Sequence, residues 1–188
     1  MELVETGIRL RVRDGGQELA CPFHPSRKLV REDGAGHRLS VEHIPLKHGL
    51  EVLRLVFDPE YSELTQVDLM GARLILGFVS EGAGQLTLPT TADRRIEPGR
   101  CFRFSTEVLQ VRPDRGSDLQ VDLFLCTKEM VMSLLGSAEV YEDCFMRAFI
   151  EEERALPLQR FDMDSDSRML TRRIARSRSA HFKHRLQL

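Results

Sequence analysis

The stretch from Gly71 to Ser105 constrains the fold most, because alternating apolar residues are interrupted there by glycine turns. Residues 74–79 alternate as is typical of a strand buried on both faces. Residues 81–84 follow with two glycines that can take positive φ, so we expect a hairpin turn. A return strand at 86–88 and a turn at 97–100, with Pro and Gly placed as in a type II turn, complete the pattern. This repeat is typical of a small antiparallel barrel.

The same pattern extends to both sides of this stretch. Further strands are expected at 52–57, 66–69, 102–104, 108–111 and 119–125. Their connections are short and no helical period lies between them, which favours a closed or sandwiched antiparallel sheet. We therefore assign residues 50–126 to a β-barrel. Residues 1–49 are assigned to an N-terminal arm with irregular strands, including an edge strand near residues 8–12.

From Thr127 onward the apolar residues recur at helical spacing. Thr127 can cap a helix over residues 128–135, and Ser137 can cap a second one. A third helix, capped by Asp164 or Ser165, would place apolar residues on one line at steps of four, namely Leu170, Ile174, Phe182 and Leu186. Strands followed by helices predict an α+β fold, with residues 127–188 as a helical dimerisation segment.

Composition and length fit one soluble domain. The chain has 188 residues, of which 41% are hydrophobic and 30% charged. No apolar window is long enough for a transmembrane helix and no signal peptide is visible, so we expect no membrane association. The cysteines form no CxxC pair, which favours a reducing, cytoplasmic location; they are Cys21, Cys101, Cys126 and Cys144.

Charge is segregated toward the C-terminus. Residues 167–188 contain seven Arg or Lys and no Asp or Glu. Contact with nucleic-acid phosphates is one interpretation. The apolar line of Leu170, Ile174 and Phe182 instead favours a helix that packs on the domain or on a second copy while its arginines face water. The helical pattern reaches Leu188 without a cap, so we expect the natural chain to continue.

The sequence predicts neither a metal site nor a catalytic set. No histidine lies between His48 and His181, and the inward strand positions are apolar. The only other possible cluster matches no standard metal site, so surface exposure is expected for its members, Cys21, His24, His37, His43 and His48. No Gly-x-Ser-x-Gly motif occurs. We therefore expect no cofactor, no metal and no enzymatic activity.

Three motifs resemble the N-terminal sensor domain of AraC/XylS-type transcription regulators. They are residues 74–84, residues 96–99 and residues 128–136. The similarity is greatest to the branch containing the regulator of the siderophore pyochelin, and there it includes residues 167–174. The resemblance implies an antiparallel cupin-like jelly-roll barrel followed by C-terminal helices. It further implies a small-molecule effector, dimerisation, and promoter DNA bound only through a C-terminal domain that this chain does not contain.

On this basis the chain is predicted to be an effector-sensing and dimerisation module. An apolar or amphipathic ligand would lie in the barrel, lined by Leu53, Leu55, Arg73, Leu76, Phe78, Leu86, Phe102, Phe104 and Leu123. Arg73, Arg54 and Arg103 could anchor a carboxylate if their strands turn them inward. The homodimer surface would include Phe149, Leu170 and Ile174. Two alternatives stay open: a cupin-fold enzyme, which needs a metal or an inward acid/base pair, and a free-standing ligand carrier.

Overall fold

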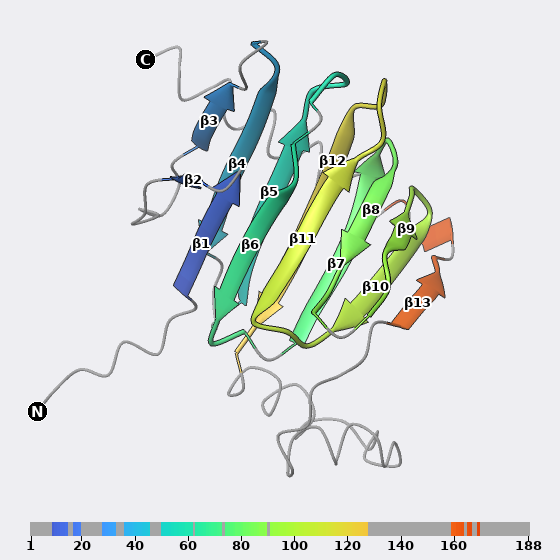
Figure 1. Ribbon diagram of the computed structural model, residues 1–188. Helices are drawn as coiled ribbons and strands as arrows, with labels where there is room; N and C mark the ends of the chain where they lie inside the picture. The colour runs from blue at the N-terminus through green and yellow to red at the C-terminus, as the bar shows by residue number, and fades with distance from the viewer. Residues whose placement is uncertain are drawn as a thin grey trace, which may run out of the picture.

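The structure is a computed structural model, and in the part of the chain that it describes thirteen strands form two antiparallel sheets (Figure 1). It describes residues 9–14, 17–19, 28–32, 36–45, 50–61, 63–72, 74–89, 91–127, 159–163, 165–166 and 169. The six-stranded sheet has the order β2 (Gln17–Leu19), β1 (Arg9–Asp14), β6 (Thr65–Met70), β11 (Val108–Pro113), β8 (Gly84–Thr87) and β9 (Arg94–Ile96). The seven-stranded sheet has the order β13 (Gln159–Asp162), β10 (Arg100–Phe104), β7 (Leu74–Glu81), β12 (Leu119–Cys126), β5 (Leu50–Phe57), β4 (Arg38–Pro45) and β3 (Lys28–Glu32).

The chain passes repeatedly from one sheet to the other between β5 and β12. Strands β5, β7, β10 and β12 lie in the seven-stranded sheet, whereas β6, β8, β9 and β11 lie in the six-stranded sheet. This alternation makes the domain a jelly-roll sandwich, so the sandwiched antiparallel sheet that the strand pattern predicts is confirmed, in the topology that the family resemblance implies. Every pairing between neighbouring strands is antiparallel, including the long β5–β12 and β7–β12 pairs.

The turn after β7 is not the predicted hairpin. β7 pairs with β10 and β12, while β8 pairs with β9 and β11, so the turn carries the chain between sheets. Gly82 takes φ +72°, and a Cβ there would lie 1.9 Å from the carbonyl oxygen of Asp118. The Ala83 amide also donates to Ser117 Oγ (3.0 Å). Packing of Gly82 and Ala83 against the β11–β12 connection therefore fixes the turn that carries the chain from one sheet to the other.

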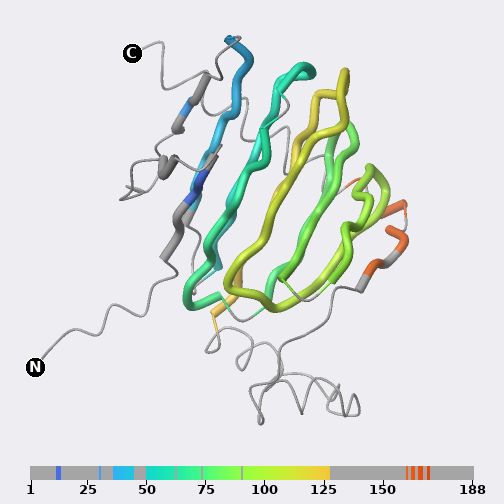
Figure 2. The backbone as a smooth tube through the Cα atoms, viewed as in Figure 1, coloured from blue at the N-terminus to red at the C-terminus, as the bar shows by residue number. Residues whose placement is uncertain are grey.

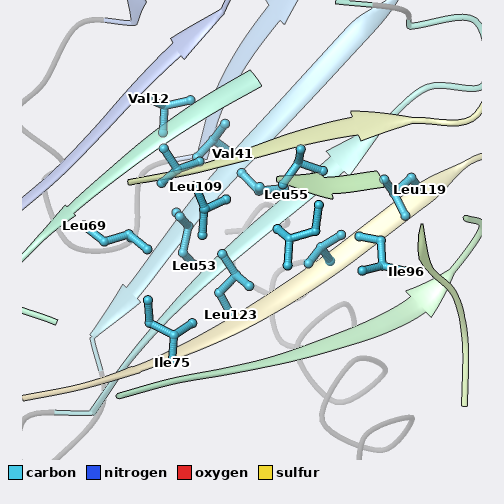
Figure 3. Close-up of a cluster of buried hydrophobic side chains, with 14 of the residues drawn as sticks. Val12, Val41, Leu53, Leu55, Leu69, Ile75, Ile96, Leu109, Leu119 and Leu123 are labelled. Atoms are coloured by element: carbon cyan, nitrogen blue, oxygen red, sulfur yellow. The ribbon is translucent and has the colours of Figure 1, made fainter. Parts of the chain in front are cut away.

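The space between the sheets is filled by one apolar cluster (Figure 3). Among the described residues it contains 23 buried side chains, most of them from the strands, such as Val12, Leu69 and Leu109 from one sheet and Leu53 and Leu123 from the other. At about 25 cal/mol per Å² of apolar surface removed from water, this cluster is the main stabilising contribution to the fold.

Strands outside residues 50–126 complete both sheets. β1 and β2 extend the six-stranded sheet, and β3, β4 and β13 extend the seven-stranded one. β13, red in Figure 2, lies beside β10 and falls inside the segment predicted to be helical. The free edge of β10 explains this difference, because β13 supplies hydrogen-bonding partners for that edge. Within the third predicted helix, Ser165, Asp166 and Met169 are helical; the other two helices lie outside the described residues.

Candidate functional site

Six of the nine predicted ligand-lining residues lie in the core between the sheets. Each is at most 3% exposed; they are Leu53, Leu55, Leu86, Phe102, Phe104 and Leu123. Five of them have no accessible area at all. A side chain bordering an internal space large enough for water would retain some accessible area, so the centre of the sandwich is packed solid around them. A ligand in the centre would have to displace these side chains.

Leu76 and Phe78 lie on the opposite side of β7 from the core. Ile75 and Val79 belong to the core cluster, and residues alternate along the strand, so Leu76 and Phe78 point away from it. The inward position between them is Gly77, where an added Cβ would meet the ring of Phe102 at 1.9 Å. The ring of Phe102 therefore takes the space that an inward side chain would use. Arg73, the remaining predicted lining residue, lies outside the described residues.

The possible carboxylate anchors Arg54 and Arg103 also point outward. Arg54 alternates with Leu53 and Leu55, and Arg103 alternates with Phe102 and Phe104, all of which belong to the core cluster. Arg54 Nε donates a 2.6 Å hydrogen bond to Asp122 Oδ1. It therefore forms a buried ion pair on the outer face of the seven-stranded sheet, meaning the face turned away from the six-stranded sheet.

A different polar pair lies on the inward side, at the end where β5 begins. His43 alternates with the core residues Leu39 and Val41, and Glu51 with Leu53 and Leu55. His43 Nε2 and Glu51 Oε2 are 2.6 Å apart, and their side chains are only 10% and 15% exposed. His43 and Glu51 are not directly opposite each other, because His43 pairs with Leu53 and Glu51 pairs with Pro45. They are diagonal neighbours on the two strands, a separation that long side chains can bridge.

Surface exposure was the sequence expectation for His43, and it is wrong. The residue is 8% exposed because it lies on β4, on the inward side that also carries the core residues Leu39 and Val41. The apolar alternation of Leu39 and Val41 continues to position 43, and this pattern could have identified His43 as an inward residue. Glu51 is likewise the inward residue before Leu53. Thr127, directly after β12, is also buried (8%). The inward polar side chains at this end define the candidate site, which we name the His43–Glu51 end.

No group of three or more His, Cys, Asp or Glu side chains in the described part of the chain could hold a metal ion. Within the same residues, no helix is long and apolar enough to cross a membrane. The predicted dimer residues Phe149, Leu170 and Ile174 lie outside the described residues.

Two cysteines lie on the outer face of the seven-stranded sheet. Burial raises the pKa of the Cys126 thiol to about 11. Burial also raises the pKa of Cys101, with a smaller upward contribution from the charge of Asp162 and a downward one from a backbone hydrogen bond. A raised pKa leaves little thiolate at neutral pH, so neither thiol is activated as a nucleophile.

No protein-family model and no curated protein matches this chain. Several solved structures show a partial likeness. An HTH_3 family transcriptional regulator from Vibrio cholerae is 11% identical over 46% of this chain and 50% of its own, with a TM-score of 0.38. The AraC-like transcriptional activator CuxR is 14% identical over 57% of this chain and 41% of its own, with a TM-score of 0.39.

An oxalate decarboxylase is 9% identical over 74% of this chain and 40% of its own, with a TM-score of 0.39. The chain thus spans half or less of the length of these structures. At such identities and TM-scores the likenesses identify neither a family nor an activity for this chain.

Proposed function

We propose that this chain is the effector-sensing module of a cytoplasmic bacterial transcription regulator and that the effector binds at the His43–Glu51 end. The observation that carries the proposal is a buried imidazole–carboxylate pair at one end of a sandwich interior that is mostly apolar. Small-molecule sites combine apolar walls with a few placed polar groups in this way. The motif resemblance to AraC/XylS sensor domains and the two-sheet jelly roll support the same function.

The chemistry of the pair indicates the class of effector. Glu51 accepts hydrogen bonds and repels anions, whereas His43 can donate or accept. The neighbouring walls are apolar, since Leu53 lies opposite His43 and Leu125 lies opposite Glu51. An uncharged amphipathic molecule with a hydroxyl or amide group therefore fits this end better than a carboxylate does.

The position of the pair also offers a route for the signal. Glu51 pairs in register with Leu125, two residues before Thr127, where the predicted helical segment starts. A ligand held by Glu51 would therefore stabilise the end of β12. We propose that this end transmits ligand binding to the segment that forms the homodimer, with Phe149 among its contacts. Promoter DNA would be bound by a further C-terminal domain.

Ligand-dependent thermal unfolding tests the proposal. The probes are uncharged aromatic alcohols and amides, with the matching hydrocarbons as controls. A ligand at about 100 times its Kd stabilises the folded state by about 2.7 kcal/mol, which raises Tm measurably. We expect this rise in the wild type and in Gln110→Ala, a control on the outer face of the six-stranded sheet. We expect none in His43→Ala or Glu51→Gln. Equal stabilisation by the hydrocarbons would contradict the proposed role of the pair.

The same pair favours a second candidate, an enzyme that uses His43 as a general base. Glu51 would orient the imidazole, as carboxylates do in acid–base catalysis. Nuclear magnetic resonance of the stabilising ligand after overnight incubation separates the two candidates. A sensor leaves the ligand unchanged, whereas an isomerase converts it in the wild type and not in His43→Ala.

A further inference from the structure

Five charged side chains form a continuous series of ion pairs along one side of the sandwich. Asp114 Oδ2 lies 3.0 Å from Arg95 Nη1, and Glu97 Oε2 lies 3.5 Å from Arg95 Nε. Arg100 extends the series, with Nη1 3.3 Å from Glu97 Oε1 and Nε 3.4 Å from Asp162 Oδ1. Acidic and basic residues alternate throughout, and we name these five residues the ion-pair chain.

The ion-pair chain connects the two sheets. Asp114 directly follows β11 and Arg95 lies on β9, two strands of the six-stranded sheet. Arg100 begins β10 and Asp162 ends β13, two strands of the seven-stranded sheet. Glu97 lies in the turn between β9 and β10 and pairs with both arginines. Figure 1 shows β9, β10 and β13 on the same side of the molecule. The side chains therefore link the β11–β12 connection to β13.

β13 is a short strand at the edge of the seven-stranded sheet. It has four residues, and in the described part of the chain it pairs with β10 alone. Its Arg160 and Asp162 side chains are exposed, Asp162 at 87%, so they remove little apolar surface from water. Met163, directly after the strand, is buried and supplies an apolar contact. A strand with so few buried contacts separates from its sheet at a lower free-energy cost than a central strand does.

The end of β13 is attached to the turn between β9 and β10. The Met163 amide donates to the Gly99 carbonyl in this turn (3.0 Å). Arg100, the next residue after Gly99, pairs with Asp162. Ser165 and Asp166, which follow Met163 within three residues, are helical. Separation of β13 from β10 would therefore also detach these helical residues from the sandwich.

The ion-pair chain lies in contact with solvent. The side chains of its two arginines, Arg95 and Arg100, are 61% and 45% exposed. Dissolved salt screens exposed charges, because the screening length falls from about 10 Å at 0.1 M to about 3 Å at 1 M ionic strength. Each exposed pair is weak by itself. Arg95, Glu97 and Arg100 each pair with two partners, however, so losing one pair changes the charge balance at the next.

We propose that β13 is a releasable strand whose attachment to β10 is controlled by ionic strength through the ion-pair chain. Low salt keeps Arg100 paired with Asp162 and holds β13 on the sheet. High salt weakens the chain, and β13 separates together with the helical residues that follow it. A change of charge at Asp114 reaches β13 through the shared partners Glu97 and Arg100. This inference does not depend on the effector or on the His43–Glu51 end.

Hydrogen–deuterium exchange of the full chain at about 0.1 M and about 1 M NaCl tests the release, because these concentrations differ strongly in screening. In the wild type we expect the protected amides of β13 to exchange about fivefold faster at the higher salt concentration, the factor associated with loss of the two exposed ion pairs of Arg100. The amides of β12, which lies between β7 and β5 in the same sheet, should exchange at an unchanged rate.

Arg100→Gln removes the pairs with Glu97 and Asp162 together. We expect β13 to exchange about fivefold faster than in the wild type at low salt, with no further acceleration at high salt. Arg94→Gln is the matched control, because Arg94 is the exposed neighbour of Arg95 on β9 and forms no ion pair with another described residue. It should exchange like the wild type.

Asp114→Asn tests transmission along the ion-pair chain, because Asp114 pairs with Arg95 at the end of the chain farthest from β13. We expect β13 to exchange about twofold faster. Exchange like that of the wild type would show that the chain transmits nothing. Equal β13 exchange in the wild type, Arg100→Gln and Arg94→Gln, or wild-type exchange independent of salt, would overturn the proposal. Faster exchange of β12 in Arg100→Gln would also overturn it, because the whole sandwich would then open.

Discussion

The two sheets share one core, but their outer faces differ in chemistry. On the six-stranded sheet the outward residues include polar side chains linked side by side: Gln66 donates to Asp68 (2.9 Å) and Gln110 to Gln66 (3.4 Å). On the seven-stranded sheet the outward residues include Val52, which is 2% exposed, and the half-buried Phe78 and Phe124. The outer face of the six-stranded sheet is therefore suited to contact with solvent, whereas the outer face of the seven-stranded sheet is shielded from solvent.

An Arg–Asp pair can be compared between the two outer faces, which makes the contrast measurable. The pair Arg13–Asp68 spans 3.4 Å with side chains 41% and 13% exposed. The pair Arg54–Asp122 spans 2.6 Å with side chains 9% and 3% exposed. The two pairs have the same residue types and differ in burial. Burial, rather than residue type, therefore decides how much each ion pair contributes to the free energy of unfolding.

The largest expected effect is the difference in the free energy of unfolding between Asp122→Ala and Asp68→Ala. Removing Asp122 leaves the buried guanidinium of Arg54 without its closest partner, which costs about 3–5 kcal/mol of the free energy of unfolding. Removing Asp68 breaks a solvated pair worth about 0–1 kcal/mol. Urea unfolding of both variants measures the two costs. Similar losses would show that the two faces are equally covered.

The next effect on stability concerns Gly77, the inward residue between Leu76 and Phe78 on β7. Gly77→Ala places a Cβ against the packed ring of Phe102, which stacks on Phe104 with centroids 5.9 Å apart. Overpacking of this kind costs about 1–3 kcal/mol. In the control Gly77→Ala/Phe102→Leu, the smaller side chain should recover part of the loss. If Gly77→Ala is as stable as the wild type by urea unfolding, the close packing of the Phe102 ring against Gly77 is wrong.

The smallest expected effect is a difference in thiol reactivity between Cys101 and Cys126, which both lie on the outer face of the seven-stranded sheet. With a pKa of about 11, Cys126 has roughly one thiolate in a thousand at pH 8. We therefore expect iodoacetamide to modify Cys101 before Cys126, and the rate at Cys126 to rise about tenfold per pH unit up to that pKa. Peptide mass spectrometry resolves the two sites. A faster reaction at Cys126 would mean that its part of the face is open.

The strands were predictable from sequence where alternation is strong. Residues 52–57, 74–79 and 119–125 lie within β5, β7 and β12, and the turns at Gly82 and Gly99 take positive φ as expected. The sheet to which each strand belongs was not predictable, because sequence neighbours such as β7 and β8 share no pairing. β13 was also missed, since the four residues QRFD show no strand alternation and pair only because β10 offers an edge.

The candidate site was harder to predict than the fold. His43 and Glu51 are eight residues apart in the sequence. They meet only because β4 pairs with β5 in a register that makes the two residues diagonal neighbours. Arg54 stands inside an apolar run, where sequence alone could not decide its direction; the pairing with Asp122 decides it. Leu76 and Phe78 alternate like core residues, and only the structure shows that they face outward, because Ile75 and Val79 belong to the core cluster and the inward Gly77 lies against Phe102.

Hydroxyl-radical footprinting of the folded and urea-unfolded chain tests the contrast between the faces most directly, because each residue is compared with itself. We predict that Val52, which is 2% exposed, is nearly unreactive in the folded state, whereas Met70, at the end of β6 and 46% exposed, keeps about half of its reactivity. A folded-state reactivity of Val52 close to its unfolded value would contradict a covered outer face on the seven-stranded sheet.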